Sequence, residues 1–159
     1  MLKFGLTLIL RILLLLLMLL CILTFGILLP VIAEEMALMW PEIAYIKGPM
    51  LIMTRTLVFL FMCAIGIIIY MTFDYDRNGA YTPRFLMLLR ALAILGFLGA
   101  AGVTGVFFYL SRLGGPGPGP GLLMIGGTIC ILIVSVVLLL IHRIITHALE
   151  YKDVFDTTV

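Results

Sequence analysis

Four long apolar runs separated by short polar connections dominate the hydrophobic pattern of this chain. They cover residues 12–33, 51–73, 86–111 and 122–145. Each run is near or above the roughly 20 residues that a helix needs to cross about 30 Å of hydrocarbon. Because the apolar residues are continuous and do not alternate, the pattern predicts transmembrane helices and not barrel strands. We therefore expect an all-α integral membrane protein, a single domain over 1–159 that forms a four-helix transmembrane bundle.

Composition supports a membrane environment. Hydrophobic residues make up 64% of the 159 residues, and charged residues only 11%, whereas soluble domains carry about 25% charged residues. One small core cannot hide this apolar excess, so the lipid bilayer is the expected partner of most of the surface. A net charge of +2 without a basic stripe gives no reason to expect direct nucleic-acid binding. Nothing in the pattern predicts an oligomeric state.

The positions of Lys and Arg predict the orientation, because cytoplasmic ends of transmembrane helices are enriched in both. The first run is longer than the 7–15 apolar residues of a signal peptide, so we expect it to be retained as a span. With both termini inside, the outer side carries only Lys47, Arg55 and Arg112. The cytoplasmic side then carries the other seven: Lys3, Arg11, Arg77, Arg84, Arg90, Arg143 and Lys152. The chain is thus predicted to be a multi-pass cell-membrane protein with cytoplasmic N- and C-termini.

The first outer loop, residues 34–50, holds the first candidate site. It is too long for a tight turn, and two interpretations stay open: a short interfacial helix broken before Pro41, or a lid over a binding cleft. Arg55 follows few apolar residues, so it can reach outward to a carboxylate of this loop. Such contacts would make either a structural ion pair or a small polar cleft. The candidate outer cleft consists of Glu34, Glu35, Trp40, Glu42, Tyr45 and Arg55.

The other connections are shorter. The inner loop 74–83 predicts an antiparallel hairpin, and Thr82-Pro83 is a typical helix start, with Thr able to cap free backbone N–H groups. Asp74, Asp76 and Asn78 copy the first half of a calcium-binding loop, but Phe85 occupies the twelfth position, where a bidentate Glu is required. We therefore expect a plain turn there. A Gly/Pro connector at 114–121 is expected to be a simple exposed loop.

Small residues recur along the third run, at Gly96, Gly99, Gly102 and Gly105. Such residues let helix backbones approach closely in lipid. We expect these glycines to form a helix-packing seam, either inside the molecule or, alternatively, as a dimer face.

No constellation for catalysis stands out. His142 and His147 are five residues apart, which does not place them on one face of a helix as metal ligands. Cys21, Cys63 and Cys130 all lie in apolar runs and are expected to be free, buried thiols. The sequence predicts no enzyme activity, no metal and no cofactor.

Short motifs spread over nearly the whole chain resemble one family. These are Leu29-Pro30, Pro41-Glu42-x-Ala44-Tyr45 with Pro49 and Leu51, Asp76-x-Asn78-x-Ala80-Tyr81, and Ala148-x-x-x-Lys152-x-x-x-Asp156-x-Thr158-Val159. Together they resemble the YoaS-like family of small bacterial four-helix membrane proteins, a domain of unknown function. The Gly/Pro connector and the leucine-rich first run depart from that family's pattern.

The resemblance implies a bacterial protein of the plasma membrane that is often encoded beside a small Cro/C1-type helix-turn-helix regulator. It suggests a non-enzymatic sensor or membrane tether for such a cytoplasmic transcriptional regulator. The expected partner surface is the inner loop with the C-terminal tail, at Tyr75, Tyr81, Arg84, Tyr151, Lys152 and Phe155. The alternative function is an immunity or resistance protein that binds an antimicrobial peptide or a lipid precursor through the first outer loop.

Overall fold

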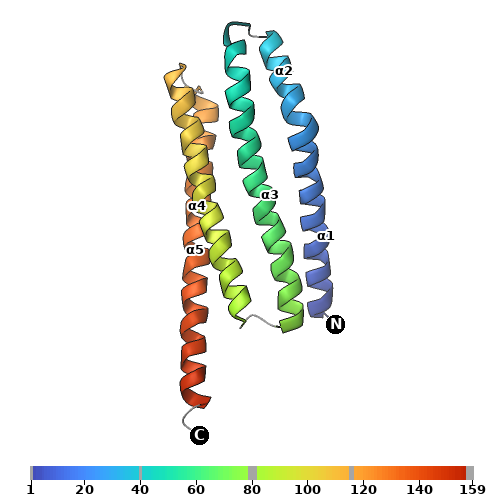
Figure 1. Cartoon of the computed structure of the whole chain (residues 1–159), viewed down its shortest axis with the longest axis vertical. Helices are drawn as coiled ribbons and strands as arrows, with labels where there is room; N and C mark the ends of the chain where they lie inside the picture. The colour runs from blue at the N-terminus through green and yellow to red at the C-terminus, as the bar shows by residue number, and fades with distance from the viewer. Residues whose placement is uncertain (1, 40, 79–81, 115–116, 157–159) are drawn as a thin grey trace.

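The computed structural model describes residues 2–39, 41–78, 82–114 and 117–156, with the side chains of 2–6, 43, 77–78 and 150–156 outside this description. The elements in chain order are helix α1 (Leu2–Leu23), the π-helix η1 (Thr24–Leu28), α2 (Leu29–Met39), the 3₁₀-helix η2 (Pro41–Ile46), α3 (Lys47–Asn78), α4 (Pro83–Arg112) and α5 (Pro118–Asp156) (Figure 1). Everything regular in the described residues is helical. Four stretches among them are long and apolar enough to cross a membrane: Thr7–Met39, Ala44–Asp76, Pro83–Arg112 and Pro118–Leu149. The predicted all-α fold with four membrane-length helices is confirmed.

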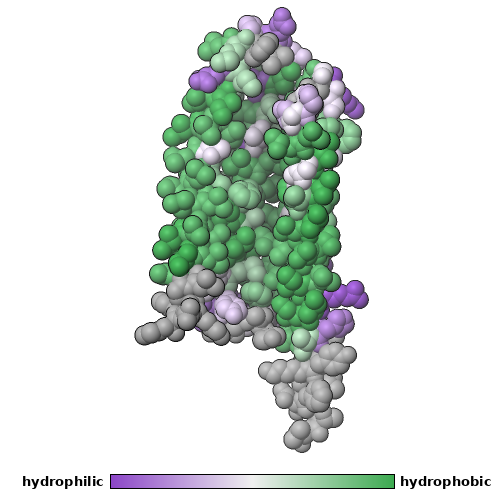
Figure 2. All heavy atoms as spheres, turned by 180° about the vertical axis from the view of Figure 1, so that it is seen from behind, coloured by the Kyte–Doolittle hydropathy of each residue, from purple (hydrophilic) through white to green (hydrophobic). Residues whose placement is uncertain are grey.

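Apolar side chains cover the middle of the molecule on the face shown in Figure 2, with hydrophilic residues gathered mainly at its ends. Few side chains are buried: no more than 17% of the most apolar window of any span is buried. Burial of apolar area is the main favourable term in folding, so this protein cannot satisfy its apolar surface by itself. The exposed apolar band is the surface that lipid must cover.

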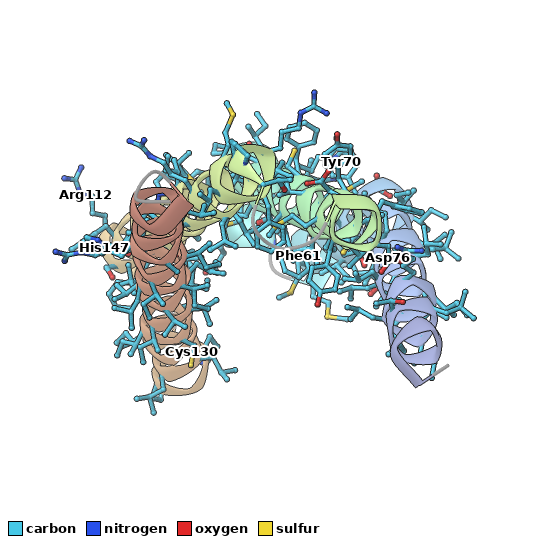
Figure 3. The ribbon with its side chains drawn as sticks, turned by 90° about the horizontal axis from the view of Figure 1, so that it is seen from below. Phe61, Tyr70, Asp76, Arg112, Cys130 and His147 are labelled. Carbon is cyan, nitrogen blue, oxygen red and sulfur yellow. The ribbon has the colours of Figure 1, made fainter. Side chains whose placement is uncertain are left out.

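The four spans form a curved row and do not close around a common axis. Viewed along the helices, the row runs from α1 through α3 and α4 to α5 (Figure 3). Within the described residues α1 and α2 pack on α3, α3 on α4, and α4 on α5, whereas no Cα atom of α1 or α2 comes within 8 Å of α4 or α5. The four helices of the predicted bundle thus lie in an open row. In lipid no hydrophobic drive forces the two end helices together, because lipid tails cover their faces equally well.

The first span continues further than the sequence pattern predicts. Residues 34–39 belong to α2, and α3 already starts at Lys47, so most of the predicted outer loop 34–50 is helical and only η2 connects the two helices. Pro30 would be expected to clash with the carbonyl of Gly26 four residues earlier in a regular helix. The wider coil of η1, in which the Leu29 N–H reaches back to the carbonyl of Thr24, relieves that clash. The π-helix thus carries the chain past the proline.

Two other connections are also shorter than expected. Asp74 to Asn78 form the last turn of α3, so the predicted inner loop 74–83 begins too early, and these residues cannot adopt a calcium-binding loop. At the Gly/Pro connector, α5 begins at Pro118, within the predicted loop 114–121. Gly114 (φ 115°) and Gly117 (φ 74°) adopt backbone conformations that glycine tolerates best.

Two glycines of α4 lie close to two different neighbouring helices. A Cβ atom on Gly96 would collide with the Ser135 hydroxyl of α5, and one on Gly102 would lie 2.6 Å from a methyl group of Leu57 on α3. Gly99 and Gly105 have no such neighbour within 4 Å. A step of three residues turns a helix by about 300°, so a three-residue stripe winds around α4 by roughly 60° per step. The predicted single seam is therefore two separate close approaches inside the molecule.

Candidate functional site

Polar groups occur at both ends of the row. We call the end that holds both chain termini and the α3–α4 connection the terminal end, and the opposite end, which holds η2 and the α4–α5 connection, the η2 end (Figure 1). The sequence-predicted partner surface belongs to the terminal end, and the predicted outer cleft to the η2 end. The two ends differ in how their charges are paired.

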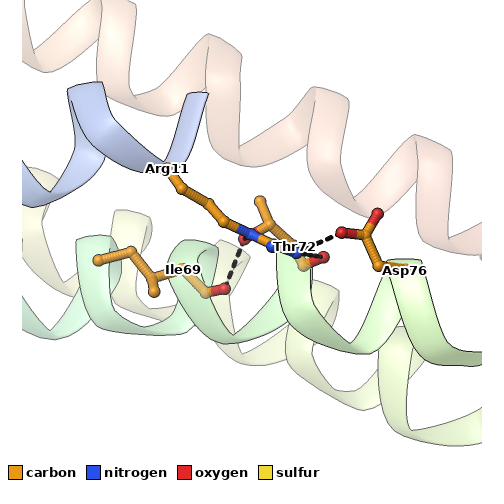
Figure 4. A network of polar contacts seen from close by, with 4 residues as sticks. All are labelled: Arg11, Ile69, Thr72 and Asp76. Carbon is orange, nitrogen blue, oxygen red and sulfur yellow. Dashed lines mark hydrogen bonds and ion pairs between the residues drawn. The ribbon is translucent and has the colours of Figure 1, made fainter. Parts of the chain in front are cut away.

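A polar network at the terminal end joins α1 to the last turns of α3 (Figure 4). The Arg11 guanidinium donates to the Thr72 backbone carbonyl at 2.8 Å, to the Thr72 hydroxyl at 3.4 Å, and to the Asp76 carboxylate at 2.5 Å. Its central carbon lies 4.0 Å from the centroid of the Phe73 ring. The Arg11 side chain is only 17% exposed. This arginine is thus almost fully partnered by one neighbouring helix.

The local sequence of α3 explains why the groups that contact Arg11 lie together. Thr72 and Asp76 are four residues apart, so they share one helix face, and Phe73 is adjacent to that face. The Thr72 hydroxyl donates back to the Ile69 carbonyl at 2.7 Å, which orients its oxygen toward Arg11. A charge removed from water is costly unless it is paired and hydrogen-bonded. Here both conditions are met, so the network holds α1 against α3.

The distribution of Lys and Arg predicted a cytoplasmic Arg11, but the pairing with Asp76 was not predicted. The signal was present, since a basic residue just before the first run and an acidic residue just after the second meet at the same end of an antiparallel hairpin. Asp74 is also buried, with 7% exposure, and accepts a hydrogen bond from the Thr82 hydroxyl at 3.3 Å. Thr82 does occupy the N-cap position before Pro83, but its side chain makes no capping bond there, contrary to the expectation. The hydroxyl instead ties the end of α3 to the start of α4.

The predicted partner surface is described only in part. Tyr75 and Arg84 are exposed. Tyr81 lies outside the described residues. Tyr151, Lys152 and Phe155 belong to the last turns of α5, whose side chains are likewise outside the description. These turns project beyond the other helices at the terminal end (Figure 1).

The predicted outer cleft is not assembled as expected. Glu34, Glu35, Glu42 and Tyr45 are exposed, and Trp40 lies outside the described residues. Arg55 pairs with none of the three glutamates; instead Glu34 approaches the Lys47 ammonium at 3.9 Å. The guanidinium of Arg55 lies 5.5 Å from the Phe25 ring centroid in η1, and its buried Nε has no hydrogen-bond partner. Glu34 and Glu35 are part of α2, which stays helical to Met39, and the residue that approaches Arg55 from the first span is Phe25, nine residues before Glu34.

An apolar cavity of about 330 Å³ lies between α2, η2 and the start of α3. One face of α2 lines it with residues at helical spacing: Leu29, Ile32, Ala33, Met36 and Ala37. Across from them are Ile46, Met50, Leu51 and Leu110, with Lys47 and Thr54 as the polar members of the wall. The volume falls at the lower end of the range for small-molecule sites, about 300–1,000 Å³. The 29-32-33-36-37 spacing was visible in the sequence, but the prediction of a loop over 34–50 concealed it.

Other reactive groups are scattered. Within the described residues no group of three or more His, Cys, Asp or Glu side chains is placed to hold a metal ion. All three cysteines are free as predicted, but only Cys21 is buried; Cys63 is half-buried and Cys130 is exposed on α5.

Comparison with known protein families identifies a family for this chain. A family model described as "Protein of unknown function (DUF2975)" matches residues 31–159, which include α3, α4 and α5 and most of α2. Neither a curated protein nor a solved structure matches the chain.

Proposed function

From the premise that the chain belongs to the DUF2975 family of proteins of unknown function, we propose that it is a non-enzymatic sensor or tether for a small cytoplasmic regulator. The chain is a multi-pass membrane protein, with four candidate spans among its described residues. The resemblance to YoaS-like proteins supplies the kind of partner, a helix-turn-helix transcriptional regulator. In this proposal the membrane is the bacterial plasma membrane, and the terminal end faces the cytoplasm.

The observation that supports this function is the projection of α5. Gly96 faces Ser135 in the antiparallel α4–α5 pair, and α4 begins thirteen residues before Gly96, at Pro83. Thirteen residues beyond Ser135 is Ala148. From there to Asp156, α5 has no length of α4 to pack against, and no other helix contacts α5 within the described residues. A helical segment without an intramolecular partner is available to dock another protein.

The chemistry of this end suits a protein partner. Tyr75 near the end of α3 and Arg84 near the start of α4 are exposed at the terminal end, and the tail sequence adds Tyr151 and Phe155. Tyrosine and arginine are enriched among residues that dominate protein–protein binding energy. A regulator that bound here would contact the membrane protein at the end of α5 and at the ends of α3 and α4.

Co-purification tests the proposal. Detergent-extracted full-length protein, a variant truncated after Ala148, and Tyr151→Ala/Phe155→Ala are compared for recovery of candidate helix-turn-helix regulators. We expect full-length protein to recover its regulator and both altered tails to lose it. Glu42→Ala, at the η2 end, is the matched control and should recover as much as wild type. Equal recovery by all four proteins would contradict a tail-mediated tether.

A second candidate function is supported by the apolar cavity at the η2 end. It is an immunity or resistance protein that binds an antimicrobial peptide or a lipid precursor at that end. Cells that express wild type, Ala33→Phe or Ala37→Phe, whose larger side chains would fill the cavity, would be challenged with antimicrobial peptides. Reduced protection in the variants is the expected result, and identical sensitivity across all of them and an empty vector would rule this function out.

A further inference from the structure

The η2 end arranges apolar and charged groups in layers along α3. The cavity wall contains Met50, Leu51 and Thr54, so the cavity reaches seven residues along α3 from Lys47. Seven residues of α-helix correspond to about 10 Å. Beyond Lys47 the wall is aliphatic except for Thr54, with side chains from α2, α3 and α4, and Lys47 is the one charged residue among the described residues of the wall. The cavity therefore runs from the polar end of the molecule into its apolar band.

Two alanines make the space available. Ala33 and Ala37 lie on the α2 face that lines the cavity, between larger neighbours such as Ile32 and Met36. An apolar cavity of this size is poor at holding water, because each water needs two to four polar partners. In a membrane the available apolar occupant is a hydrocarbon chain. The shape and lining of the cavity suit a single acyl chain that enters from the polar end.

Two opposite charges lie next to the cavity, Lys47 in its wall and Glu34 beside Lys47. Lys47 is part of the cavity wall and is 37% exposed, and its only ion pair in the described residues is the long 3.9 Å approach to Glu34. Such an exposed pair contributes little to stability and is easily exchanged for another partner. Glu34 is 69% exposed. The opening thus presents one cation in the wall of the apolar space, with one exposed carboxylate beside it.

We propose that this cavity is a binding site for a zwitterionic membrane phospholipid with an ammonium head group. One acyl chain fills the cavity, the phosphate pairs with Lys47, and the ammonium group interacts with Glu34. The order of groups in the lipid, which is chain, phosphate and then ammonium, matches the order of cavity, Lys47 and Glu34 in the protein. Glu34 disfavours a purely anionic lipid, and Lys47 repels a purely cationic amphiphile.

This inference does not depend on the tether function, which concerns the opposite end. It shares its cavity with the second candidate function but requires neither resistance nor a peptide, because the ligand is a resident component of the bilayer. A failure in lipid binding would leave regulator recovery unchanged, and the reverse also holds. The two sets of variants have no residue in common.

Native mass spectrometry tests the site. Purified full-length protein is equilibrated with equal amounts of dioleoyl phosphatidylethanolamine and dioleoyl phosphatidylglycerol, which have identical chains, and retained lipids are counted. We expect one retained lipid per chain, with an enrichment of phosphatidylethanolamine of about fivefold, or roughly 1 kcal/mol. Ala33→Phe should abolish retention by filling the cavity. Lys47→Met and Glu34→Gln should keep retention but reduce the enrichment to less than twofold.

The matched control is Val31→Phe. Val31 is on the same helix, is 45% exposed and does not line the cavity, so this variant should retain lipid as wild type does. Size-exclusion chromatography and helix content confirm folding, and if Ala33→Phe does not fold, Ala37→Phe and the two charge variants decide. Equal retention of the two lipids by wild type would overturn the proposal, as would unchanged retention in the folded cavity-filling variant.

Discussion

The two ends of the α1–α3 seam use the same pair of residue types with opposite results. At the terminal end Arg11 lies against Phe73, and at the η2 end Arg55 lies against Phe25. Arg11 also has a carboxylate, a carbonyl and a hydroxyl as partners. Arg55 has none of these, and its Nε is buried without a hydrogen bond. A cation–π contact alone is thus compatible with two different environments.

This difference indicates where the first hairpin is held and where it can change. Between the two arginines the seam packs Leu14, Cys21 and Ile65 into a small buried cluster. The terminal end closes that cluster with a partnered charge, which is costly to disrupt. The η2 end closes it with an incompletely partnered charge beside the π-helix, and π-helical turns occur frequently at functional sites. A change at the η2 end of the seam is therefore expected to cost less than a change at the terminal end.

The largest expected effect comes from breaking the terminal network. Asp76→Asn removes the carboxylate and leaves the guanidinium of Arg11 mostly buried without a counter-charge. Asp76 is itself 31% exposed, so solvent recovers part of the cost, and we expect a loss of about 2 kcal/mol in the free energy of unfolding. Unfolding in mixed detergent measures this loss. Glu35→Gln is the control, and an equal loss there would mean that the network is not specific.

Replacing both partners sharpens the comparison. Arg11→Leu/Asp76→Leu removes the charge pair as a unit, and apolar replacements of buried pairs are often neutral or stabilising. We expect the double variant to unfold within about 1 kcal/mol of wild type and to be more stable than Asp76→Asn. The same unfolding titration checks this order. A double variant less stable than Asp76→Asn would show that the network does more than neutralise a buried charge.

Arg55→Met tests the opposite end. The substitution removes a guanidinium with an unsatisfied buried nitrogen, at the cost of one cation–π contact that is worth about 0.5–1 kcal/mol. Relief of the unsatisfied donor, about 1–3 kcal/mol, should outweigh that loss. We expect the free energy of unfolding to rise by up to about 1 kcal/mol. A destabilisation as large as that of Asp76→Asn would remove the distinction between the two ends.

The smallest effect is expected for Phe25→Leu. Leucine keeps apolar contact with the seam but removes the ring beneath Arg55, so the loss should be about 0.5 kcal/mol. Phe73→Leu provides the comparison at the terminal end, where Arg11 keeps its hydrogen bonds. Both variants would be measured by the same titration, and an effect above about 2 kcal/mol in Phe25→Leu would show that the ring has a larger role than cation–π contact.

Sequence reasoning worked best for elements whose environment is lipid. Run length and continuity predicted all four spans, and the Thr82-Pro83 start of α4 was found correctly. It was less successful at the polar connections. The glutamates of 34–35 signalled a loop, but they lie in the last turns of α2, because a helix that leaves the bilayer need not end there. In the same way, Asp74 and Asp76 signalled a turn and instead belong to α3.

The candidate sites were predicted as residues but not as contacts. Glu34 and Arg55 were both named, yet the partner of Glu34 is Lys47, and Arg55 faces Phe25. Of the four glycines of α4, Gly96 and Gly102 make close approaches to different helices, α5 and α3, and Gly99 and Gly105 make none among the described residues. Spacing defines a face of one helix, but it does not say which neighbour that face meets.

The sequence by itself determined that this chain is a membrane protein and how many times it can cross, because hydrocarbon acts on each helix separately and needs only length and apolarity. Only the tertiary structure decided that the spans form an open row, that Arg11 meets Asp76, and that Ala33 and Ala37 leave a cavity beside Lys47. These features depend on the registers between helices, which arise from packing of specific side chains. In lipid many such registers cover apolar surface equally well, so composition and periodicity cannot select one.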